Sequence, residues 1–348
     1  MLNIFICHRP YHILRSADII YKYYQDDDCE NVLISYNLIN INIQHFKQGK
    51  RYPALEKRFS RVIMKERDDV SIWKLRAFNH YYYTKIKENH SMVEEFSQFD
   101  NLYFFSDLEK PIEILVGMLK ESKKESANVY IVDEGIASYY RQRPVWEDLV
   151  KGCITSLFRY KYINHTANYG LSHLYTKAMA SYPDKCRFRC NHIDKMLPMS
   201  TELLNDVAQE CNAGIDLNSN FVLYLSSIID ISFGVKKDEE IRILTEMKTS
   251  AAQKGYKFYI KAHPVQDVHY YTSVETLKDS VVKTELPAEI FFKDTAVIAS
   301  VASSSLINAE LQGIKALDLS YLFGIDMKSV LLPKLRPLDL DDFERMLD

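Results

Sequence analysis

The chain has 348 residues, of which 47% are hydrophobic and 26% are charged, as in an ordinary globular protein. Its formal net charge of −3 argues against a nucleic-acid-binding protein, because such proteins are usually clearly basic. The length predicts two domains of roughly 150 residues each.

A strand, a turn and a helix are predicted at the N-terminus. The apolar run from Leu2 to Cys7 is typical of a buried strand, and the residues from His8 to Tyr11 interrupt it before a helix begins. Doubly wound α/β domains start in this way and bind ligands where the first strand ends. Tyr11 and His12 are therefore candidates for the acceptor side of a site, although packing at a helix start explains them equally well. The glycine-rich dinucleotide fingerprint is absent.

An aromatic and basic helix is predicted at residues 71–88, after two short strands at 32–35 and 61–64. One interpretation places this helix on an anionic membrane surface or against a sugar acceptor. The other places it in the core, with its lysines reaching the solvent. We favour the core, because apolar residues occur all round the helix.

Two adjacent carboxylates follow a buried strand in the first half of the chain. A strand at 101–105 and a helix at 111–121 lead to the apolar run 128–132, which ends on Asp133, Glu134 and Gly135. Acidic residues at the carboxyl end of such a strand point to the ligand-binding edge of the sheet. Glycine permits a sharp turn or the close approach of a ligand. An acidic turn without chemistry is the alternative.

Residues 136–204 are the least readable part of the chain. Arginines and tyrosines alternate there, which fits either the acceptor side of a site or an inter-domain arm. Cys186, Cys190 and His192 offer three metal ligands, but the fourth is missing and the spacing fits no common zinc pattern. The polar run 212–220 then predicts a boundary, which gives domains 1–212 and 213–348.

The second domain also alternates strands and helices. Its first elements are a strand at 221–225, a helix at 238–255 and a strand at 256–262. Polar residues follow each strand: Ser226, Ser227 and Asp230 after the first, and His263, followed by Pro264, after the second. These residues lie at the edge where such sheets bind ligands, although a single histidine there is more often structural.

A row of three serines lies in the later part of the second domain. Glu289 lies in a helix expected to begin at Pro287, where it either complements the helix dipole or holds the hydroxyls of a ribose. Ser303, Ser304 and Ser305 then start a helix that ends at Gly313. Hydroxyls and free N–H groups at a helix start suit a phosphate, and a serine cap without a ligand is the alternative. Further short strands are predicted at 281–282, 296–302 and 316–319.

These motifs resemble those of bacterial sialyltransferases of the lipooligosaccharide and capsule type. The resemblance rests on the acidic-acidic-glycine motif at 133–135, the histidine-proline motif at 263–264 and the serine motif at 303–305, in this order. The opening N-I-F-I-C-H-R-P-Y-H also resembles that of the same enzymes, and V-A-S-S-S-L-I and L-P-A-E resemble capsular polysialyltransferase segments. In outline the resemblance covers most of the chain, but residues 136–204 stay unmatched.

The resemblance implies a GT-B-like fold of two facing Rossmann-like domains with the active site in the cleft. It implies an inverting enzyme that uses CMP-sialic acid as donor and needs no cofactor or metal. By the motif, Glu134 is the base, Asp133 supports the turn and His263 is the general acid. Asp230 is a second candidate for the base. The implied donor-binding residues are Ser303, Ser304, Ser305, Glu289, Pro264, Gly135, Ser226 and Ser227.

Two other functions fit the same residues. One is a transferase that uses another CMP- or CDP-activated donor, such as an acidic sugar or a polyol phosphate. The other is a catalytically inactive sugar-binding scaffold. The expected partners are a nucleotide-sugar donor and a glycan acceptor, with no nucleic acid. The sequence predicts a cytoplasmic protein, because it shows no signal peptide and no apolar run of ~18 residues. Peripheral attachment to the inner membrane, a homodimer and the acceptor glycan stay open.

Overall fold

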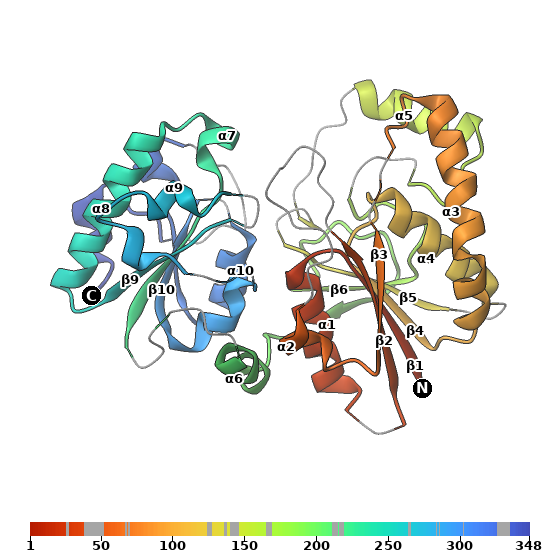
Figure 1. Ribbon diagram of the computed structural model, residues 1–348, viewed down its shortest axis with the longest axis horizontal. Coiled ribbons are helices and arrows are strands. Elements are labelled where there is room, and N and C mark those ends of the chain that lie inside the picture. Colours follow the sequence, from red (N-terminus) through yellow and green to blue (C-terminus); the bar gives the residue numbers. More distant parts are fainter. Residues whose placement is uncertain are drawn as a thin grey trace. The chain divides into compact units, whose positions relative to one another are not determined.

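The computed structural model divides into two compact units, of which the first ends at Leu197 and the second begins at Pro198. Each unit is built on one parallel β-sheet with helices on both faces (Figure 1). The described residues are 1–25, 28–37, 52–66, 68, 70–123, 127–135, 138–139, 146–164, 169–210, 215, 219–263, 266–282, 284, 286–301, 303–325 and 335–348.

The division between the units comes earlier in the chain than the expected boundary at residues 212 and 213. Helix α6 (Thr201–Glu210) lies before that boundary, yet it packs against the 3₁₀ helix η3 (Ala288–Asp294) of the second unit. The polar run after α6 therefore does not separate the two units.

The first unit contains a seven-stranded parallel sheet in the order β3-β2-β1-β4-β5-β6-β7. Its strands are β1 (Leu2–Cys7), β2 (Glu30–Asn37), β3 (Arg61–Glu66), β4 (Asn101–Phe104), β5 (Asn128–Val132), β6 (Lys177–Ala180) and β7 (Ile193–Lys195). Its helices are α1 (Pro10–Tyr23), α2 (Pro53–Glu56), α3 (Leu75–Glu95), α4 (Lys110–Ser122) and α5 (Trp146–Leu157). The chain adds strands on one side of β1 and then on the other, as in doubly wound domains.

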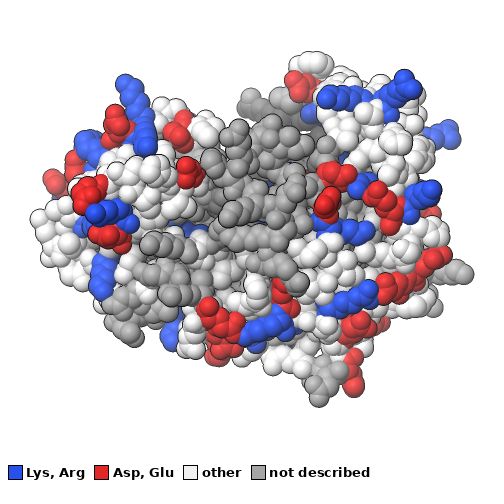
Figure 2. Space-filling model, viewed as in Figure 1, with Lys and Arg blue, Asp and Glu red and all other residues white. Residues whose placement is uncertain are grey.

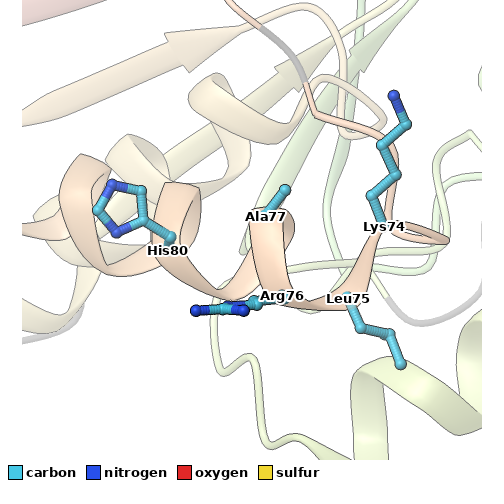
Figure 3. A pocket seen from close by; sticks show the side chains of 5 residues that line it. All are labelled: Lys74, Leu75, Arg76, Ala77 and His80. Carbon is cyan, nitrogen blue, oxygen red and sulfur yellow. The ribbon is translucent and has the colours of Figure 1, made fainter.

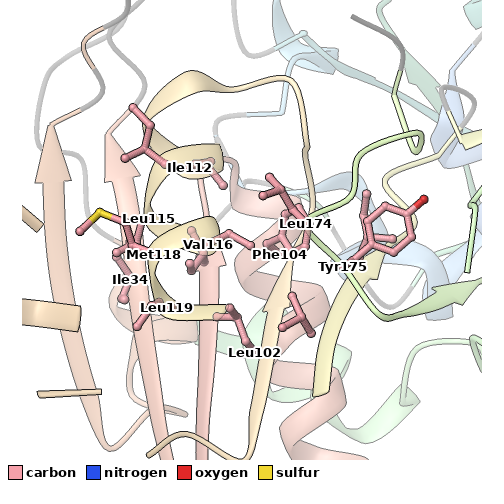
Figure 4. Packing of buried hydrophobic residues seen from close by; sticks show 14 of the residues in the cluster. Ile34, Leu102, Phe104, Ile112, Leu115, Val116, Met118, Leu119, Leu174 and Tyr175 are labelled. Atoms are coloured by element: carbon pink, nitrogen blue, oxygen red, sulfur yellow. The ribbon is translucent and has the colours of Figure 1, made fainter. Parts of the chain in front are cut away.

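The first core lies between the sheet and α4. Strand β1 is apolar without alternation, because helices cover both faces of the sheet. Helix α4 is buried from Pro111 to Leu119, since α3 covers the side that faces away from the sheet. Figure 4 shows the side chains of α4 against Leu102 and Phe104 of β4.

The predicted aromatic helix is α3, which starts and ends later than expected. Phe78, Tyr81 and Tyr82 are buried in the core, as we favoured from the sequence. Trp73 and Tyr83 are exposed. The aromatic residues of this stretch therefore divide between the core and the surface.

The second unit contains a four-stranded parallel sheet in the order β11-β10-β8-β9. Its strands are β8 (Phe221–Leu225), β9 (Lys257–Lys261), β10 (Thr295–Ser300) and β11 (Lys315–Asp318). Its other elements, besides α6 and η3, are α7 (Ile229–Phe233), α8 (Lys237–Gln253), α9 (His269–Thr272), η2 (Lys278–Ser280), α10 (Ser304–Leu311), η4 (Ser320–Phe323) and α11 (Leu340–Arg345).

Two details of this unit differ from the sequence-based expectations. Val281 makes only an isolated bridge to Ile260, so the predicted strand at 281–282 does not form. The helix expected to begin at Pro287 is the 3₁₀ helix η3, with Pro287 as its N-cap residue. Helix α10 does end just before Gly313, whose φ of +75° suits glycine. No helix of the described residues has the length and apolar character to span a membrane.

Candidate active site

Polar side chains of the first unit gather where β1, β4 and β5 end. The strand order reverses between β1 and β4, so this is the edge at which doubly wound sheets bind ligands. Asp133 and Glu134 follow β5, and His8 directly follows the last residue of β1. His12 lies in the first turn of α1.

Asp133 holds the turn after β5. Its side chain accepts hydrogen bonds from the backbone N–H groups of Gly135 at 2.7 Å and Ser181 at 3.2 Å, and from the hydroxyl of Tyr139. The residue is buried, and both of its oxygens are occupied. Gly135 has a φ of +119°, a conformation that favours glycine. This turn directs the next carboxylate, that of Glu134, to the edge of the sheet.

Glu134 contacts His12 across the ends of two strands. The Nε2 atom of His12 lies 3.0 Å from Oε2 of Glu134. The His12 side chain is 1% exposed and that of Glu134 is 12% exposed. The imidazole stacks on Phe105, with ring centres 4.4 Å apart and planes 5° apart, and the ring of His8 meets it edge-on at 4.4 Å. These two rings fix the orientation of the imidazole toward Glu134.

The arrangement suits proton transfer. A partly exposed carboxylate beside a buried, fixed imidazole can accept a proton, and the imidazole can stabilise either charge state through its hydrogen bond. The exposed guanidinium of Arg9 adds a positive charge 4.0 Å from Oε2 of Glu134. The sequence indicated His12 only as an acceptor-side candidate and missed His8. The signal that could have identified His8 is its spacing from His12, because the two histidines lie on either side of the start of one helix.

The same side chains form a donor set of the kind that divalent metal ions use. The ligand atoms of His8, His12 and Glu134 all lie within 4.8 Å of one another. The candidate metal ligands at Cys186, Cys190 and His192 do not form such a set. Cys186 Sγ donates to the carbonyl oxygen of Pro183, and His192 pairs with Asp194. The only cluster of three metal-ligating side chains within the described ranges is thus at the Glu134 edge.

Two further carboxylates near this edge anchor the residues that follow α5. Burial raises the pKa of Asp107 to about 6, and its side chain accepts the backbone N–H groups of Gly170 and Ser172, each at 3.0 Å. Burial also raises the pKa of Glu113 to about 7, which the Lys110 charge partly offsets. Glu113 accepts hydrogen bonds from Lys110 and from the backbone of Asn164. Both carboxylates serve packing rather than a ligand.

Tyr11 has a contact of its own beside this site. Its hydroxyl accepts a long 3.5 Å hydrogen bond from Arg15, and its ring centre lies 6.2 Å from that of His12. Tyr11 therefore lies beside the histidine.

The serines after β8 belong to a hydrogen-bond network of the second unit. Ser227 Oγ lies 3.0 Å from Ser300 Oγ at the end of β10. The hydroxyl oxygen of Tyr271 lies 2.9 Å from Ser226 Oγ and 2.8 Å from the carboxylate of the buried Glu240. Burial raises the pKa of Glu240, and three tyrosine hydroxyls in contact with it oppose that shift. The order of strands reverses between β8 and β10, so these serines lie at the ligand-binding edge.

His263 and Asp230 lie close to the same edge. His263 follows β9 after one residue, is half-buried, and its carbonyl oxygen accepts the N–H of Gln266. Pro264 lies outside the described residues. Asp230 is in the first turn of α7, and its buried Oδ1 has no hydrogen-bond partner within the described part of the chain. The preceding Ile228 has a φ of +47°, which is strained for a β-branched residue.

The serine motif starts α10, as the sequence predicted. Ser303 is the N-cap, and its hydroxyl accepts the N–H of Ser305 at 3.3 Å. The Ser305 hydroxyl donates to Glu289 at 2.8 Å, and Asn308 donates to the same oxygen at 3.0 Å. Glu289 is 2% exposed. The hydroxyl of Ser304 forms no hydrogen bond with any described residue, so both its proton and its oxygen are available to a ligand.

The chain is similar to one protein family and to several solved structures. A model of the family described as alpha-2,8-polysialyltransferase (POLYST) matches residues 3–318. No curated protein matches the chain in sequence. UDP-GlcNAc 2-epimerase from Methanocaldococcus jannaschii is similar in structure, with a TM-score of 0.56 and 10% identity over 99% of this chain and 91% of that chain.

Two other solved structures are also similar. Another UDP-N-acetylglucosamine 2-epimerase has a TM-score of 0.54 and 10% identity, over 99% of this chain and 86% of that chain. The GT-B domain of a sialyltransferase from Photobacterium damselae has a TM-score of 0.44 and 12% identity, over 88% of this chain and 87% of that chain. The epimerase likenesses show the fold alone. They confirm the predicted GT-B-like class with two parallel-sheet α/β units.

Proposed function

Because this chain belongs to the alpha-2,8-polysialyltransferase family and is a sialyltransferase, we propose that it transfers sialic acid from CMP-sialic acid to a hydroxyl of a cell-surface glycan. The acceptor in this proposal is a lipooligosaccharide or a capsular polysaccharide. The transfer inverts the anomeric carbon and needs no metal. The observation that carries the proposal is the Glu134 carboxylate, held at a sheet edge by His12 in a chain that the family model matches over residues 3–318.

Glu134 is the base in this proposal. Sialyl transfer passes through a cationic, oxocarbenium-like state, and the acceptor hydroxyl must lose its proton as the new bond forms. Glu134 is partly exposed, whereas Asp133 is buried with both oxygens occupied by the turn. This difference supports Glu134 over Asp133 as the group that accepts the proton. Asp230 stays the second candidate, and its partnerless Oδ1 is the feature in its favour.

The second unit binds the nucleotide in this proposal. The N-terminus of α10 offers N–H groups and the Ser304 hydroxyl to the single phosphate of CMP. His263 donates a proton or a hydrogen bond to that phosphate as it leaves. Glu289 positions Ser305 through one oxygen, and its other oxygen is the one proposed to hold the ribose hydroxyls. Ser226, Ser227, Gly135 and Pro264 complete the proposed donor-binding residues.

Product analysis tests the proposal. The protein is incubated with CMP-sialic acid and a panel of galactose-, lipooligosaccharide- and sialic-acid-terminated acceptors, and the products are analysed by mass spectrometry and NMR. The expected result is one added sialic acid or a sialic acid chain with inverted anomeric configuration, and far less product with Glu134→Gln. Transfer from a CDP-polyol donor, without transfer from CMP-sialic acid, would overturn the proposal in favour of another transferase.

A further inference from the structure

Helix α5 turns an apolar stripe outward. Trp146 is 70% exposed, Leu149 is 64% exposed and Leu157 is 79% exposed, and the side chain of Cys153 is exposed between them. The spacings of three and four residues place these side chains on one face of the helix. Helices at the surface of a globular protein normally direct such a face to the core. The stripe of α5 is therefore free to contact something other than its own unit.

The opposite face of α5 attaches the helix to the first unit. Thr155 is buried and bonds to backbone carbonyl groups of its own helix, and Ile154 packs against the main core of the unit. Lys151 Nζ lies 5.9 Å from the centre of the Trp73 ring. The outward direction of Trp146 and Leu157 is thus the consequence of how the helix is held.

Other exposed apolar residues belong to the segments next to α5. Trp73 and Leu75 stand at the start of α3, and Phe158 follows the last residue of α5. Each of these three is at least a third exposed. We name these residues the α5 surface: Trp73, Leu75, Trp146, Leu149, Cys153, Leu157 and Phe158. An apolar surface of this kind on a soluble domain marks an interaction site.

Cations flank the α5 surface. Lys74, Arg76 and Arg159 are exposed and form no ion pair with any residue that the structure describes. Lys74 and Arg76 also line an open hollow with Leu75, Ala77 and His80, and Figure 3 shows their side chains extending away from the helix on different sides. Lys and Arg side chains gather at the end of this unit where α3 and α5 lie (Figure 2).

We propose that the α5 surface binds an anionic phospholipid bilayer. Trp146, Leu149 and Leu157 enter the boundary between headgroups and acyl chains, where tryptophan is favoured. Lys74, Arg76 and Arg159 contact the lipid phosphates, and each such cation adds to the binding free energy near an anionic surface. The structure favours this occupant over a second copy of the chain. A twofold interface would bring two copies of this cationic patch together, and no acidic residue belongs to the α5 surface to compensate that charge.

Vesicle flotation tests the proposal with the full chain. Wild-type protein is mixed with phosphatidylcholine vesicles that contain or lack phosphatidylglycerol, at low and high salt. The expected result is flotation with the anionic vesicles, weaker at high salt. The triple variant W146S/L149S/L157S should float about tenfold less, and K74E/R76E should lose the preference for anionic vesicles. The matched control is Leu338→Ser in the second unit, where Leu338 is 70% exposed.

Several outcomes would overturn this proposal. They are wild-type protein that does not float, a triple variant that floats as well as wild type, and a control that loses flotation to the same degree. A wild-type dimer that becomes a monomer in the triple variant would assign the α5 surface to a second copy instead. Circular dichroism confirms that the variants fold. Sialyl transfer to a soluble acceptor is measured for the same variants, so that a loss of vesicle binding can be distinguished from a loss of the proposed activity.

Discussion

The imidazole of His12 and the carboxylate of Glu134 are 3.0 Å apart, although 122 residues separate them in the sequence. The contact exists because the strands that precede the two residues, β1 and β5, both pair with β4 in parallel. Parallel strands end at the same edge, so the residues after β1 and β5 are brought to one place. A carboxylate and an imidazole in this relationship can share the proton that an acceptor hydroxyl releases.

Replacement of Glu134 by glutamine should remove the proton acceptor and preserve the shape of the side chain. We expect kcat to fall by about 10²–10⁴-fold, with the KM for CMP-sialic acid nearly unchanged. Steady-state kinetics with varied donor give both constants. The control is Glu109→Gln, a carboxylate of similar exposure near His8 at the same edge. A fall of the same size with Asp230→Asn, but not with Glu134→Gln, would move the base to the second unit.

His12 acts on the acceptor proton through Glu134, so it is a positioning residue. His12→Ala should lower kcat by about 10–100-fold and alter the acid limb of the pH–rate profile, because Glu134 loses the imidazole that lies 3.0 Å from its carboxylate. His12→Gln, which can still donate to Glu134, should recover part of the rate. If His12→Ala lowers the rate without any change in the pH profile, and His12→Gln recovers nothing, the role of the imidazole is packing against Phe105.

Added metal should inhibit the enzyme rather than activate it. A chelator such as EDTA should leave the rate unchanged, because the proposed mechanism uses no metal. Zn²⁺ should inhibit by binding His8, His12 and Glu134, since it would occupy the oxygen that accepts the proton. In His8→Ala the inhibition should require about tenfold more Zn²⁺. Loss of activity in EDTA that Zn²⁺ restores would contradict the proposal and make the cluster a catalytic metal site.

The stability of the first unit should depend on pH through Glu113. Burial raises its pKa from 4.5 to about 7, so the folded state binds this proton more strongly than the unfolded state does. The corresponding stability is present below pH 4.5 and is lost as the pH rises through about 7. Glu113→Gln cannot ionise. From about pH 5 to about pH 8 the Tm of wild type should therefore fall by a few degrees relative to this variant.

Melting curves at a series of pH values measure this difference. The control is the exposed Glu239→Gln in the second unit, a substitution of the same type that leaves Glu113 in place. A constant difference for Glu113→Gln would show that the buried carboxyl does not titrate in this range.

The sequence predicted the strands that positioned the site, but not the contacts within it. The apolar runs of β1, β5, β8 and β10 were recognisable because strands buried on both faces do not alternate. The order of strands cannot be read from such runs, so nothing in the sequence brought His12 to Glu134. The apolar stripe of α5 is exposed, whereas apolar residues at helical spacing are usually buried. This is one reason why the sequence did not predict the structure of residues 136–204. Strands β6 and β7 in that segment are only four and three residues long.

The three serines of the α10 motif should differ in their contributions, because the structure gives each a different partner. Ser303 caps the helix, and Ser303→Ala should cost about 1 kcal/mol of stability. The Ser304 hydroxyl bonds to none of the residues that the structure describes, so Ser304→Ala should leave the Tm unchanged and weaken CMP binding by about fivefold to tenfold. Calorimetric titration with CMP and melting curves separate the two effects. A different result would mean that the cap serine binds the phosphate instead. In that case Ser304→Ala keeps its CMP affinity, whereas Ser303→Ala binds CMP more weakly without a change in Tm.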